Sequence, residues 1–564
     1  MKKAIQLLTA LVVSGASLAW AGKSQLPNII IIYTDDVGYG DLSCYNPKAA
    51  YQTPRLDRMA EQGIRFTDAH SPSTICSPSR YGLFSGQQIY RSTGRGGGAF
   101  EGPGGPSYLK PGTLTLGGML QQQGYQTGVF GKWHVGLTWL SKDGKQLRGG
   151  FESALLIDYD KSTPLVDGPN QRGFNESFIT PNCPTTDPLY IYIENGMVPS
   201  PADRRHHSKD LPNPGGKWRW DNDEGWMAPG YEFMKADLLF YEKLQTFITK
   251  HRKSRPEQPF FAVLATQIAH APVLPAPEFE GKSTAGPRGD FLLELDALTG
   301  RVLDLIAGLG IDEETLVLFN SDNGPETMHV AWMRDDHHHD PAGAWRGMKR
   351  DGWEGGHRVP FIARWPGRIP NGQVSGQMTN TTDIFATLAS IGGYKLPDDA
   401  AVDSFDMLPA MIGTQDPKQS IRPHLLTQSF AGEFQLRQGD WKYLDHKGSG
   451  GNQYKGILEK YILPETAPEA PGQLYNLATD PGETTNLYLK ETAKRQQLQA
   501  LLKELKTSGR SAPQGRVPVG IDRIPQLNAS AAALPPPNPR FPPHPGGDGR
   551  SGPGFGRPNG LQVP

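Results

Sequence analysis

The sequence predicts an α/β fold built on a mostly parallel sheet. Short, continuous apolar runs at residues 29–33, 128–130, 260–265 and 315–319 have the length and composition of buried parallel strands. Helical apolar patterns lie between them, and this alternation is typical of the α/β class. Polar residues follow each run directly or within a few positions, and ligands of such sheets gather at the carboxyl ends of the strands.

Helices that flank the sheet are predicted where apolar residues recur with the 3.6-residue period of an α-helix. The clearest case carries Leu292, Leu295, Leu298, Val302 and Leu305. The helical patterns cover residues 53–62, 115–123, 231–252 and 291–308.

The pattern changes after about residue 413. Short strands are predicted at 441–443 and 473–477, followed by an amphipathic helix at 492–506. Residues from 508 onward are rich in Pro and Gly, which favours a disordered or lightly packed tail. The expected organisation is a signal peptide at 1–21, a catalytic α/β domain at 22–413, a smaller α+β subdomain at 414–507 and a tail at 508–564.

The N-terminus is typical of a secretory signal peptide. Lys2 and Lys3 precede an apolar run over residues 4–18, which ends near the small residues Ala19 and Ala21. No later stretch has 18 consecutive apolar residues, the length that would predict a membrane span. We therefore expect a periplasmic or secreted chain without a transmembrane segment once the signal is removed.

The charge composition bears on possible partners. The chain has 57 Lys and Arg against 58 Asp and Glu, a formal net charge of -1. Such a balance gives no global basic field, so nucleic acid is not an expected partner. Recognition of an anion would depend on local groups.

The three cysteines form an odd number, which in an exported chain indicates a free or modified thiol. Cys44 and Cys183 could form a disulfide, or both could be buried and reduced, and we favour the second interpretation. Cys183 and residues 187–190 lie in a long irregular region that could face a pocket.

Oxygen-bearing side chains follow two of the predicted strands. Asp35 and Asp36 come after the first, and Asp322 and Asn323 after the fourth. Carboxylate and amide oxygens are hard ligands that suit Ca²⁺ or Mg²⁺. One divalent cation is expected, although acids at strand ends are also common as solvated loop residues or helix caps.

Cys76 precedes Pro78 and Arg80 in the sequence Cys-Ser-Pro-Ser-Arg. Proline is favoured in the first turn of a helix, so Cys76 is expected near a helix N-terminus, where oxyanions are stabilised. A small buried cysteine followed by a capping serine would have the same local pattern.

Taken together, these segments resemble the formylglycine-dependent sulfatases of the alkaline-phosphatase-like superfamily. The resemblance covers roughly residues 27–370, with a weaker likeness at 474–487, and Ser85 stands where the family more often has Thr. Six motifs in one order rarely coincide by chance. They occupy residues 34–41, 76–80, 131–134, 270–272, 321–324 and 349–360.

The resemblance implies an exported, arylsulfatase-like hydrolase of sulfate monoesters, acting on a sulfated carbohydrate or an aryl sulfate. It also implies that a formylglycine-generating enzyme oxidises Cys76 to formylglycine (3-oxoalanine). The hydrate of this aldehyde would be the nucleophile and would offer one oxygen to the cation. The cation, Ca²⁺ with Mg²⁺ as an alternative, would be held by Cys76 in its modified form with Asp35, Asp36, Asp322 and Asn323.

The resemblance also implies a role for each remaining motif residue. Arg80 and Lys132 would hold the hydrate, and His134 would take a proton from it. His270 and Lys349 would contact the sulfate and the bridging oxygen, one of them as general acid, and Lys132 would also bind the substrate. Independently of the family, cleavage of a sulfate ester requires a cation, nearby Lys or Arg and a proton donor, and the sequence offers all three.

Two other functions compete with this interpretation. A phosphatase or phosphodiesterase of the same fold would use a Thr, Ser or unmodified Cys nucleophile with two metals, and would be expected to have histidine where Asn323 stands. An inactive secreted glycan-binding protein would be free to lose Cys76, Lys132 or His134, yet all three are present.

Two further segments are candidates for the rim of a substrate pocket. Residues 335–340, which include three consecutive histidines, are expected to form a solvated loop or sugar-binding rim rather than a metal site. Trp218, Trp220 and Trp226 could form a glycan platform, although a packed tryptophan-rich loop is slightly favoured.

Overall fold

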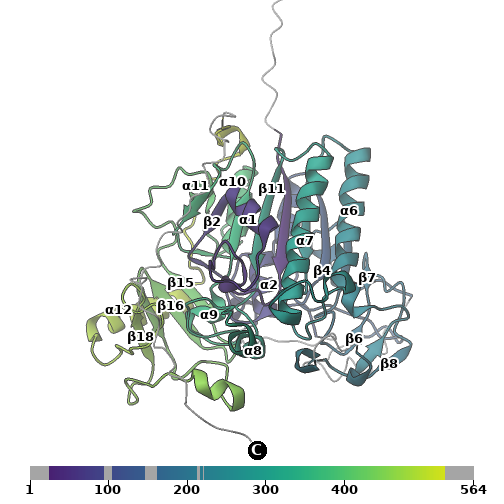
Figure 1. Ribbon diagram of the computed structural model, residues 1–564. Coiled ribbons are helices and arrows are strands. Elements are labelled where there is room, and N and C mark those ends of the chain that lie inside the picture. The colour runs from purple at the N-terminus through teal and green to yellow at the C-terminus, as the bar shows by residue number, and fades with distance from the viewer. Residues whose placement is uncertain (1–24, 94–104, 147–161, 212–215, 220–221, 528–564) are drawn as a thin grey trace, which may run out of the picture.

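The computed structural model describes residues 25–93, 105–146, 162–211, 216–219 and 222–527. The predicted signal peptide and the tail beyond residue 527 lie outside the described residues. Figure 1 shows a large domain around one sheet, with a smaller lobe that contains the later strands and α12.

The main sheet has nine strands in the order β13-β2-β12-β11-β1-β10-β4-β5-β7. The five strands from β11 to β5 are all parallel, whereas β12 and β7 run antiparallel to their neighbours β11 and β5. The prediction of a mostly parallel sheet is therefore confirmed. The strands are β1 (Asn28–Thr34), β2 (Ile64–Phe66), β4 (Gln126–Lys132), β5 (Glu176–Thr180), β7 (Ile193–Glu194), β10 (Phe260–Ala265), β11 (Thr315–Ser321), β12 (Phe361–Arg364) and β13 (Gln373–Ser375).

The central strand β1 shows why its sequence is apolar throughout. Successive side chains of a strand point to opposite faces. Ile29 and Ile31 pack into one hydrophobic cluster, whereas Ile30 and Ile32 pack into another on the opposite face. Both faces are buried under helices, so both sets of side chains must be apolar.

Helices cover both faces of the sheet, as Figure 1 shows for α6 and α7 on one of them. The predicted helices are present with shifted ends: α7 begins five residues earlier than the apolar pattern because Pro287 suits its first turn. One face carries α1 (Pro54–Glu61), α6 (Ala236–Ser254), α7 (Gly286–Gly308) and α8 (Thr327–His337), and the other carries α2 (Cys76–Ser85), α4 (Leu116–Gln122) and α10 (Asp383–Ile391).

The smaller lobe is an antiparallel sheet of four strands in the order β15-β16-β17-β18, with α12 packed against it. The strands predicted at 441–443 and 473–477 and the helix predicted at 492–506 are all found here. The elements of this lobe are β15 (Leu425–Gln428), β16 (Phe434–Gln438), β17 (Trp441–Leu444), β18 (Gln473–Asn476) and α12 (Thr492–Thr507).

Short elements complete the fold. Residues 508–527 return to the large domain, where Ile521 and Ile524 are buried. The short elements are β3 (Ala69–His70) paired with β14 (Thr379–Asn380), the sheet of β6 (Leu189–Tyr190), β9 (Gly225–Met227) and β8 (Arg204–His206), and the single-turn helices α3 (Tyr90–Thr93), α9 (Glu354–His357) and α11 (Leu408–Met411).

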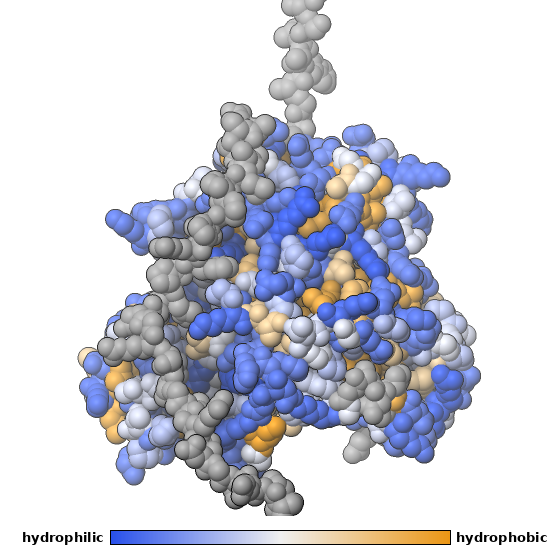
Figure 2. All heavy atoms as spheres, in the orientation of Figure 1, coloured by the Kyte–Doolittle hydropathy of each residue, from blue (hydrophilic) through white to orange (hydrophobic). Residues whose placement is uncertain are grey.

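The surface seen in Figure 2 is mainly hydrophilic, and its hydrophobic side chains show as separate small patches. Among the helices of the described chain, none combines the length and the apolar character that a membrane span requires.

A buried ionic network joins the large domain to the smaller lobe. Lys442 of β17 is only 1% exposed, and its Nζ lies 3.1 Å from both Glu354 Oε1 and Glu483 Oε1. The same Nζ lies 3.1 Å from His357 Nε2. Because buried charges must be paired, this network fixes α9 against the four-stranded sheet.

We expect Lys442→Met to lower the free energy of unfolding by about 3–5 kcal/mol, because it leaves Glu354 and Glu483 buried without their shared cation. Urea denaturation measures the change. Lys503→Met, at an exposed site on α12, is the matched control and should stay within about 0.5 kcal/mol of the parent. Equal effects of the two substitutions would contradict a stabilising network.

Candidate active site

The carboxyl ends of four neighbouring strands bring the predicted site residues to one edge of the sheet. Asp35 and Asp36 follow β1, Lys132 ends β4, His270 follows β10, and Asp322 follows β11. These strands are adjacent in the order β11-β1-β10-β4. Residues as distant in sequence as Asp36 and Asn323, which are 287 positions apart, therefore come into direct contact.

Cys76 is the first residue of α2 and faces this edge. Ile75 before it is extended (φ -145°, ψ 161°), so the chain turns into the helix at the cysteine itself. The side chain is buried, and burial raises the pKa of the Cys76 thiol, although Lys132 and Lys349 oppose the shift. The sulfur therefore lies at a helix N-terminus in a cationic environment.

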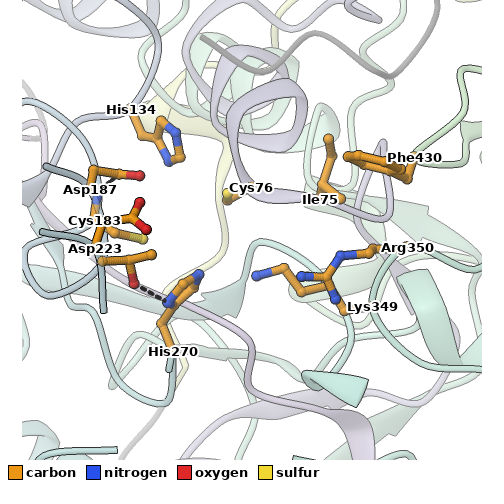
Figure 3. A pocket seen from close by; sticks show the side chains of 11 residues that line it. Ile75, Cys76, His134, Cys183, Asp187, Asp223, His270, Lys349, Arg350 and Phe430 are labelled. Atoms are coloured by element: carbon orange, nitrogen blue, oxygen red, sulfur yellow. Dashed lines mark hydrogen bonds between the residues drawn. The ribbon is translucent and has the colours of Figure 1, made fainter. Parts of the chain in front are cut away.

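A cavity of about 250 Å³ opens next to Cys76. Figure 3 shows His134 and Cys183 on one side of it, His270 below, and Lys349 and Arg350 on the opposite side. Its lining residues are Ile75, Cys76, His134, Cys183, Thr186, Asp187, Asp223, His270, Lys349, Arg350 and Phe430.

Three cations pair with the three buried aspartates of the site. Lys132 Nζ lies 2.5 Å from Asp35 Oδ2, and Lys349 Nζ lies 2.8 Å from Asp36 Oδ1. Arg80 Nε donates to Asp322 Oδ2 at 2.9 Å, and its Nη1 donates to the Lys132 carbonyl at 2.9 Å. Burial opposes ionisation of Asp35, but the charges of Lys132, His270, Arg80 and Lys349 together outweigh it and hold the pKa of Asp35 well below its usual range.

The oxygen set fits a hard divalent cation. Oxygens of Asp35, Asp36 and Asp322 lie within 4.8 Å of one another. Asp35 Oδ1 and Asn323 Oδ1 are buried, and among the described residues neither has a hydrogen-bond partner. Buried oxygens of this kind normally have partners, so these two are available as ligands.

The backbone and the charges support the same assignment. Asp36 has a positive φ of 57°, which breaks the strand alternation just where two successive carboxylates are needed on one side. Burial and the neighbouring Asp35 carboxylate raise the pKa of Asp322 to about 7. A cation held by Asp35, Asp36, Asp322 and Asn323 would offset this repulsion between buried carboxylates.

The two histidines lie on different sides of the cavity. Burial and the Lys132 charge hold the pKa of His134 well below its usual range, so its ring is neutral. His270 Nδ1 lies 2.6 Å from the Ala271 carbonyl and 3.3 Å from the Thr186 hydroxyl. The carbonyl requires a proton on Nδ1, which leaves His270 Nε2, 3.9 Å from Asp36 Oδ2, as the basic nitrogen.

Known protein families, curated proteins and solved structures match this chain. The family model described as Sulfatase matches residues 27–394. This chain belongs to the sulfatase family. A second model, N-sulphoglucosamine sulphohydrolase, C-terminal, matches residues 345–510 of the sulfatase and so includes its smaller lobe.

Curated relatives match the sulfatase over most of its length. It is 32% identical over 502 residues to N-acetylgalactosamine-6-O-sulfatase of Bacteroides thetaiotaomicron, covering 86% of this chain and 94% of the relative. It is 33% identical over 473 residues to arylsulfatase A of Homo sapiens, covering 82% and 83%. The protein is therefore a sulfuric ester hydrolase.

Solved structures give the same fold. One from a study of glycosaminoglycan metabolism by Bacteroides thetaiotaomicron has a TM-score of 0.70 and 29% identity, and covers 86% of this chain and 100% of that one. The PsFucS1 sulfatase from Pseudoalteromonas sp. shares the fold at a TM-score of 0.62 and 22% identity, covering 87% and 92%. The expected alkaline-phosphatase-like α/β fold with a smaller C-terminal subdomain is confirmed.

The structure gathers all of the predicted site residues of the sulfatase at one edge, but their contacts differ in kind. Cys76, His134, His270 and Lys349 line the cavity. Arg80 and Lys132 lie behind them against the aspartates. The four other predicted cation ligands lie together beside Arg80 and Lys132. They are Asp35, Asp36, Asp322 and Asn323.

Other lining residues were not singled out from the sequence. Arg350 directly follows Lys349, a proximity that could have suggested it, and its Nη1 lies 2.7 Å from Glu326 Oε1. No local sequence pattern distinguishes Asp223 or Phe430 as a site residue. Phe430 comes from the smaller lobe and reaches the cavity only through the tertiary fold. Cys183 and Asp187, from the irregular region, do face the pocket.

The expectation of a solvated segment at residues 335–340 holds for Asp335, Asp336 and His338, which are exposed, but not for His339. His337 ends α8, and His339 is fully buried, with its Nε2 3.3 Å from Asp41 Oδ1. Asp41 is itself buried and bound to Arg288, so this part of the segment is a packed ionic contact and no solvated rim. Histidine triplets look hydrophilic, but an imidazole can be buried beside a carboxylate.

The tryptophan segment is packed where the structure describes it. Trp218 is buried, with its ring 5.0 Å from that of Trp332. Trp226 lies in β9, and neither Trp218 nor Trp226 lines the cavity, while Trp220 lies outside the described residues. In the described chain, Cys44, Cys76 and Cys183 are buried thiols that form no disulfide with one another.

We expect Asp322→Ala to remove the bound cation and to lower the turnover of an aryl sulfate by at least about 100-fold, because it deletes a ligand and a buried charge together. Metal content after dialysis against Ca²⁺, and the rise of Tm with added Ca²⁺, measure the binding. Asp335→Ala, which removes a carboxylate paired with Lys460 outside the site, should leave both unchanged. A fully active Asp322→Ala variant without metal would rule out the ligand set.

Proposed function

We propose that this sulfatase hydrolyses sulfate monoesters of carbohydrates outside the cytoplasm, with a formylglycine made from Cys76 and one hard divalent cation, Ca²⁺ or Mg²⁺. The observation that carries the proposal is the position of Cys76, buried at a helix N-terminus and facing a cavity lined by His134, His270 and Lys349. The signal-peptide pattern of residues 1–21 supports export.

The charges of the site suit an anionic substrate. Arg80, Lys132 and Lys349 balance the charges of Asp35, Asp36 and Asp322, three against three. With a divalent cation bound, the site would have a net positive charge that matches a sulfate ester and the charge developing on its oxygens. A formylglycine hydrate at Cys76 would supply an oxygen nucleophile, and loss of the proton of its second hydroxyl would release sulfate and restore the aldehyde.

The proton transfers fall to the two histidines. His134 is neutral and lines the cavity beside Cys76, so it can accept the proton of the second hydroxyl of the hydrate, whose loss would expel sulfate. Lys349 is kept charged, because Asp36 and Glu326 raise its pKa despite burial, and it stabilises the negative charge on the leaving oxygen. Burial and the Lys349 charge lower the pKa of His270, so its Nε2 gains the proton that it gives to that oxygen only when an adjacent anionic substrate favours the charged imidazole.

The size of the cavity and the relatives indicate the substrate. At about 250 Å³ the cavity is small among ligand pockets, and it fits a sulfate with one sugar ring rather than an internal stretch of polymer. The relative from Bacteroides thetaiotaomicron is named N-acetylgalactosamine-6-O-sulfatase. We infer that a terminal 6-O-sulfated N-acetylgalactosamine is the substrate to test first.

We expect Cys76→Ser to keep the fold and the cation but to lose multiple turnover, because a serine alcohol can attack sulfur yet cannot release the resulting sulfate by reverting to an aldehyde. Steady-state hydrolysis should fall by at least about 1,000-fold, with no more than one product molecule per chain. Mass spectrometry of the active parent protein should find formylglycine at position 76. Sustained turnover by the variant, or an ordinary thiol in fully active protein, would refute the nucleophile.

We expect the enzyme to release sulfate from 6-O-sulfated N-acetylgalactosamine at least about 10-fold faster than from the 4-O-sulfated isomer, because the fixed sulfate position allows only one orientation of the ring in a small cavity. Ion chromatography of sulfate measures both rates. An internal 6-O-sulfated residue of a polymer should react much more slowly than a terminal one. Comparable rates on both isomers would reject this substrate but not sulfate hydrolysis.

A further inference from the structure

A second set of metal-ligating side chains lines the cavity beside the oxygen ligands. It consists of His134, Cys183 and Asp187, whose ligand atoms lie within 4.8 Å of one another, and all three residues are buried. Figure 3 shows them on one wall, with Cys183 and Asp187 on the side of the cavity that faces Cys76. The proposed reaction uses His134 as a base and assigns no part to Cys183.

We propose that His134, Cys183 and Asp187 bind a borderline-soft divalent cation of the Zn²⁺ type, and that this cation inhibits the sulfatase. The binding stands by itself, whereas the inhibition rests on the proposed function. The site is distinct from the hard-cation site in both ligands and preference.

The donor atoms decide which metal binds. An imidazole nitrogen, a thiolate sulfur and a carboxylate oxygen form a set that Zn²⁺ uses with a fourth position left open, whereas Ca²⁺ selects oxygen alone. Tetrahedral Zn²⁺ with ordinary bond lengths would hold these atoms about 3.3–3.8 Å apart. The observed separations of at most 4.8 Å are close to this, so small side-chain rotations complete the site.

Neighbouring groups hold two of the ligands in place. Asp187 Oδ2 accepts the backbone N–H of Cys183 at 2.6 Å, which fixes the carboxylate beside the thiol. Lys132 Nζ lies 2.7 Å from Cys183 Sγ; burial raises the pKa of the Cys183 thiol well above its usual range, and the Lys132 ammonium opposes that shift, so the bound cation itself has to displace the thiol proton. The same ammonium is paired with Asp35 at 2.5 Å, so its charge is largely compensated. On binding, the thiol proton is released to solvent.

A competing set shares the same cysteine. Asp35, Cys183 and His270 also lie within 4.8 Å of one another. However, Asp35 is already paired with Lys132 and belongs to the oxygen set. His270 Nδ1 is bound to the Ala271 carbonyl, which leaves that ring one nitrogen to share with the substrate. Asp187 has no part in the hard-cation site, so the set with His134 and Asp187 is preferred.

Inhibition follows from the position of the site. A cation on His134 would occupy the ring nitrogen that has to accept a proton, and it would lie inside the cavity that the sugar enters. Inhibition should therefore be competitive with substrate and reversed by a chelator followed by Ca²⁺.

Binding is tested by titrating the full chain with Cd²⁺, which reports a thiolate ligand through its ultraviolet charge-transfer absorption. The Cys76→Ala background leaves only the thiols of Cys44 and Cys183 and removes any dependence on formylglycine. With Ca²⁺ present to fill the oxygen site, we expect one thiolate-bound Cd²⁺ per chain, with the absorption lost in Cys183→Ser and kept in Cys44→Ser. Ca²⁺ should not compete for this site.

The other two ligands are tested in the same assay. Asp187→Asn and His134→Ala should each weaken Cd²⁺ binding by about 10-fold or more, while His270→Ala leaves it unchanged. Circular dichroism confirms that each variant is folded. Absorption that survives Cys183→Ser, no absorption at one equivalent of Cd²⁺, or weakening by His270→Ala instead of His134→Ala would each overturn the assignment.

Inhibition is tested separately on formylglycine-bearing enzyme. Zn²⁺ should inhibit hydrolysis of an aryl sulfate, and Cys183→Ser should require at least about 10-fold more Zn²⁺ for half inhibition relative to its own metal-free rate. Equal sensitivity of the two proteins would refute the inhibitory role. If the enzyme hydrolysed no sulfate ester while the Cd²⁺ absorption persisted, the proposed function would fail and the metal site would stand.

Discussion

The active site depends on keeping several like charges buried within a few ångströms of one another. Asp35, Asp36 and Asp322 would repel one another in a dry interior, and burial alone would neutralise them. They stay together because Arg80, Lys132 and Lys349 are buried with them and pair with them. In the proposed reaction, the same side chains that balance one another's buried charge would also hold the cation and create a positive environment for the sulfate.

The sequence predicted the catalytic edge well because a parallel sheet converts local patterns into a shared location. Each apolar run that was assigned as a strand ended in or near a polar residue, and the carboxyl ends of parallel strands necessarily meet. Asp35, Lys132, His270 and Asp322 could thus be placed together from local information. The starts of helices were less predictable, as at Pro287, because an apolar pattern marks only the buried turns.

The parts that the sequence did not predict depend on tertiary packing. His339 looked like a surface residue, yet it is buried beside Asp41, which follows β1 some 300 residues earlier in the chain. Phe430 gave no sign of a role because nothing local distinguishes it from other loop aromatics. Buried polar contacts and cavity rims are made by residues distant in sequence, so a single sequence without homologues offers little evidence for either.

The ionic contact between the lobes also bears on how the substrate specificity of sulfatases can change. Lys349 and Glu354 are five residues apart, the first at the cavity and the second bound to Lys442 of the neighbouring sheet. The backbone N–H of Phe430 donates to the Arg350 carbonyl at 3.2 Å, so the loop after β15 is fastened to the same segment. The smaller lobe thereby forms one rim of the cavity entrance. Exchange of that lobe between homologues would alter which sulfate esters can enter while the sulfur chemistry below continued unchanged.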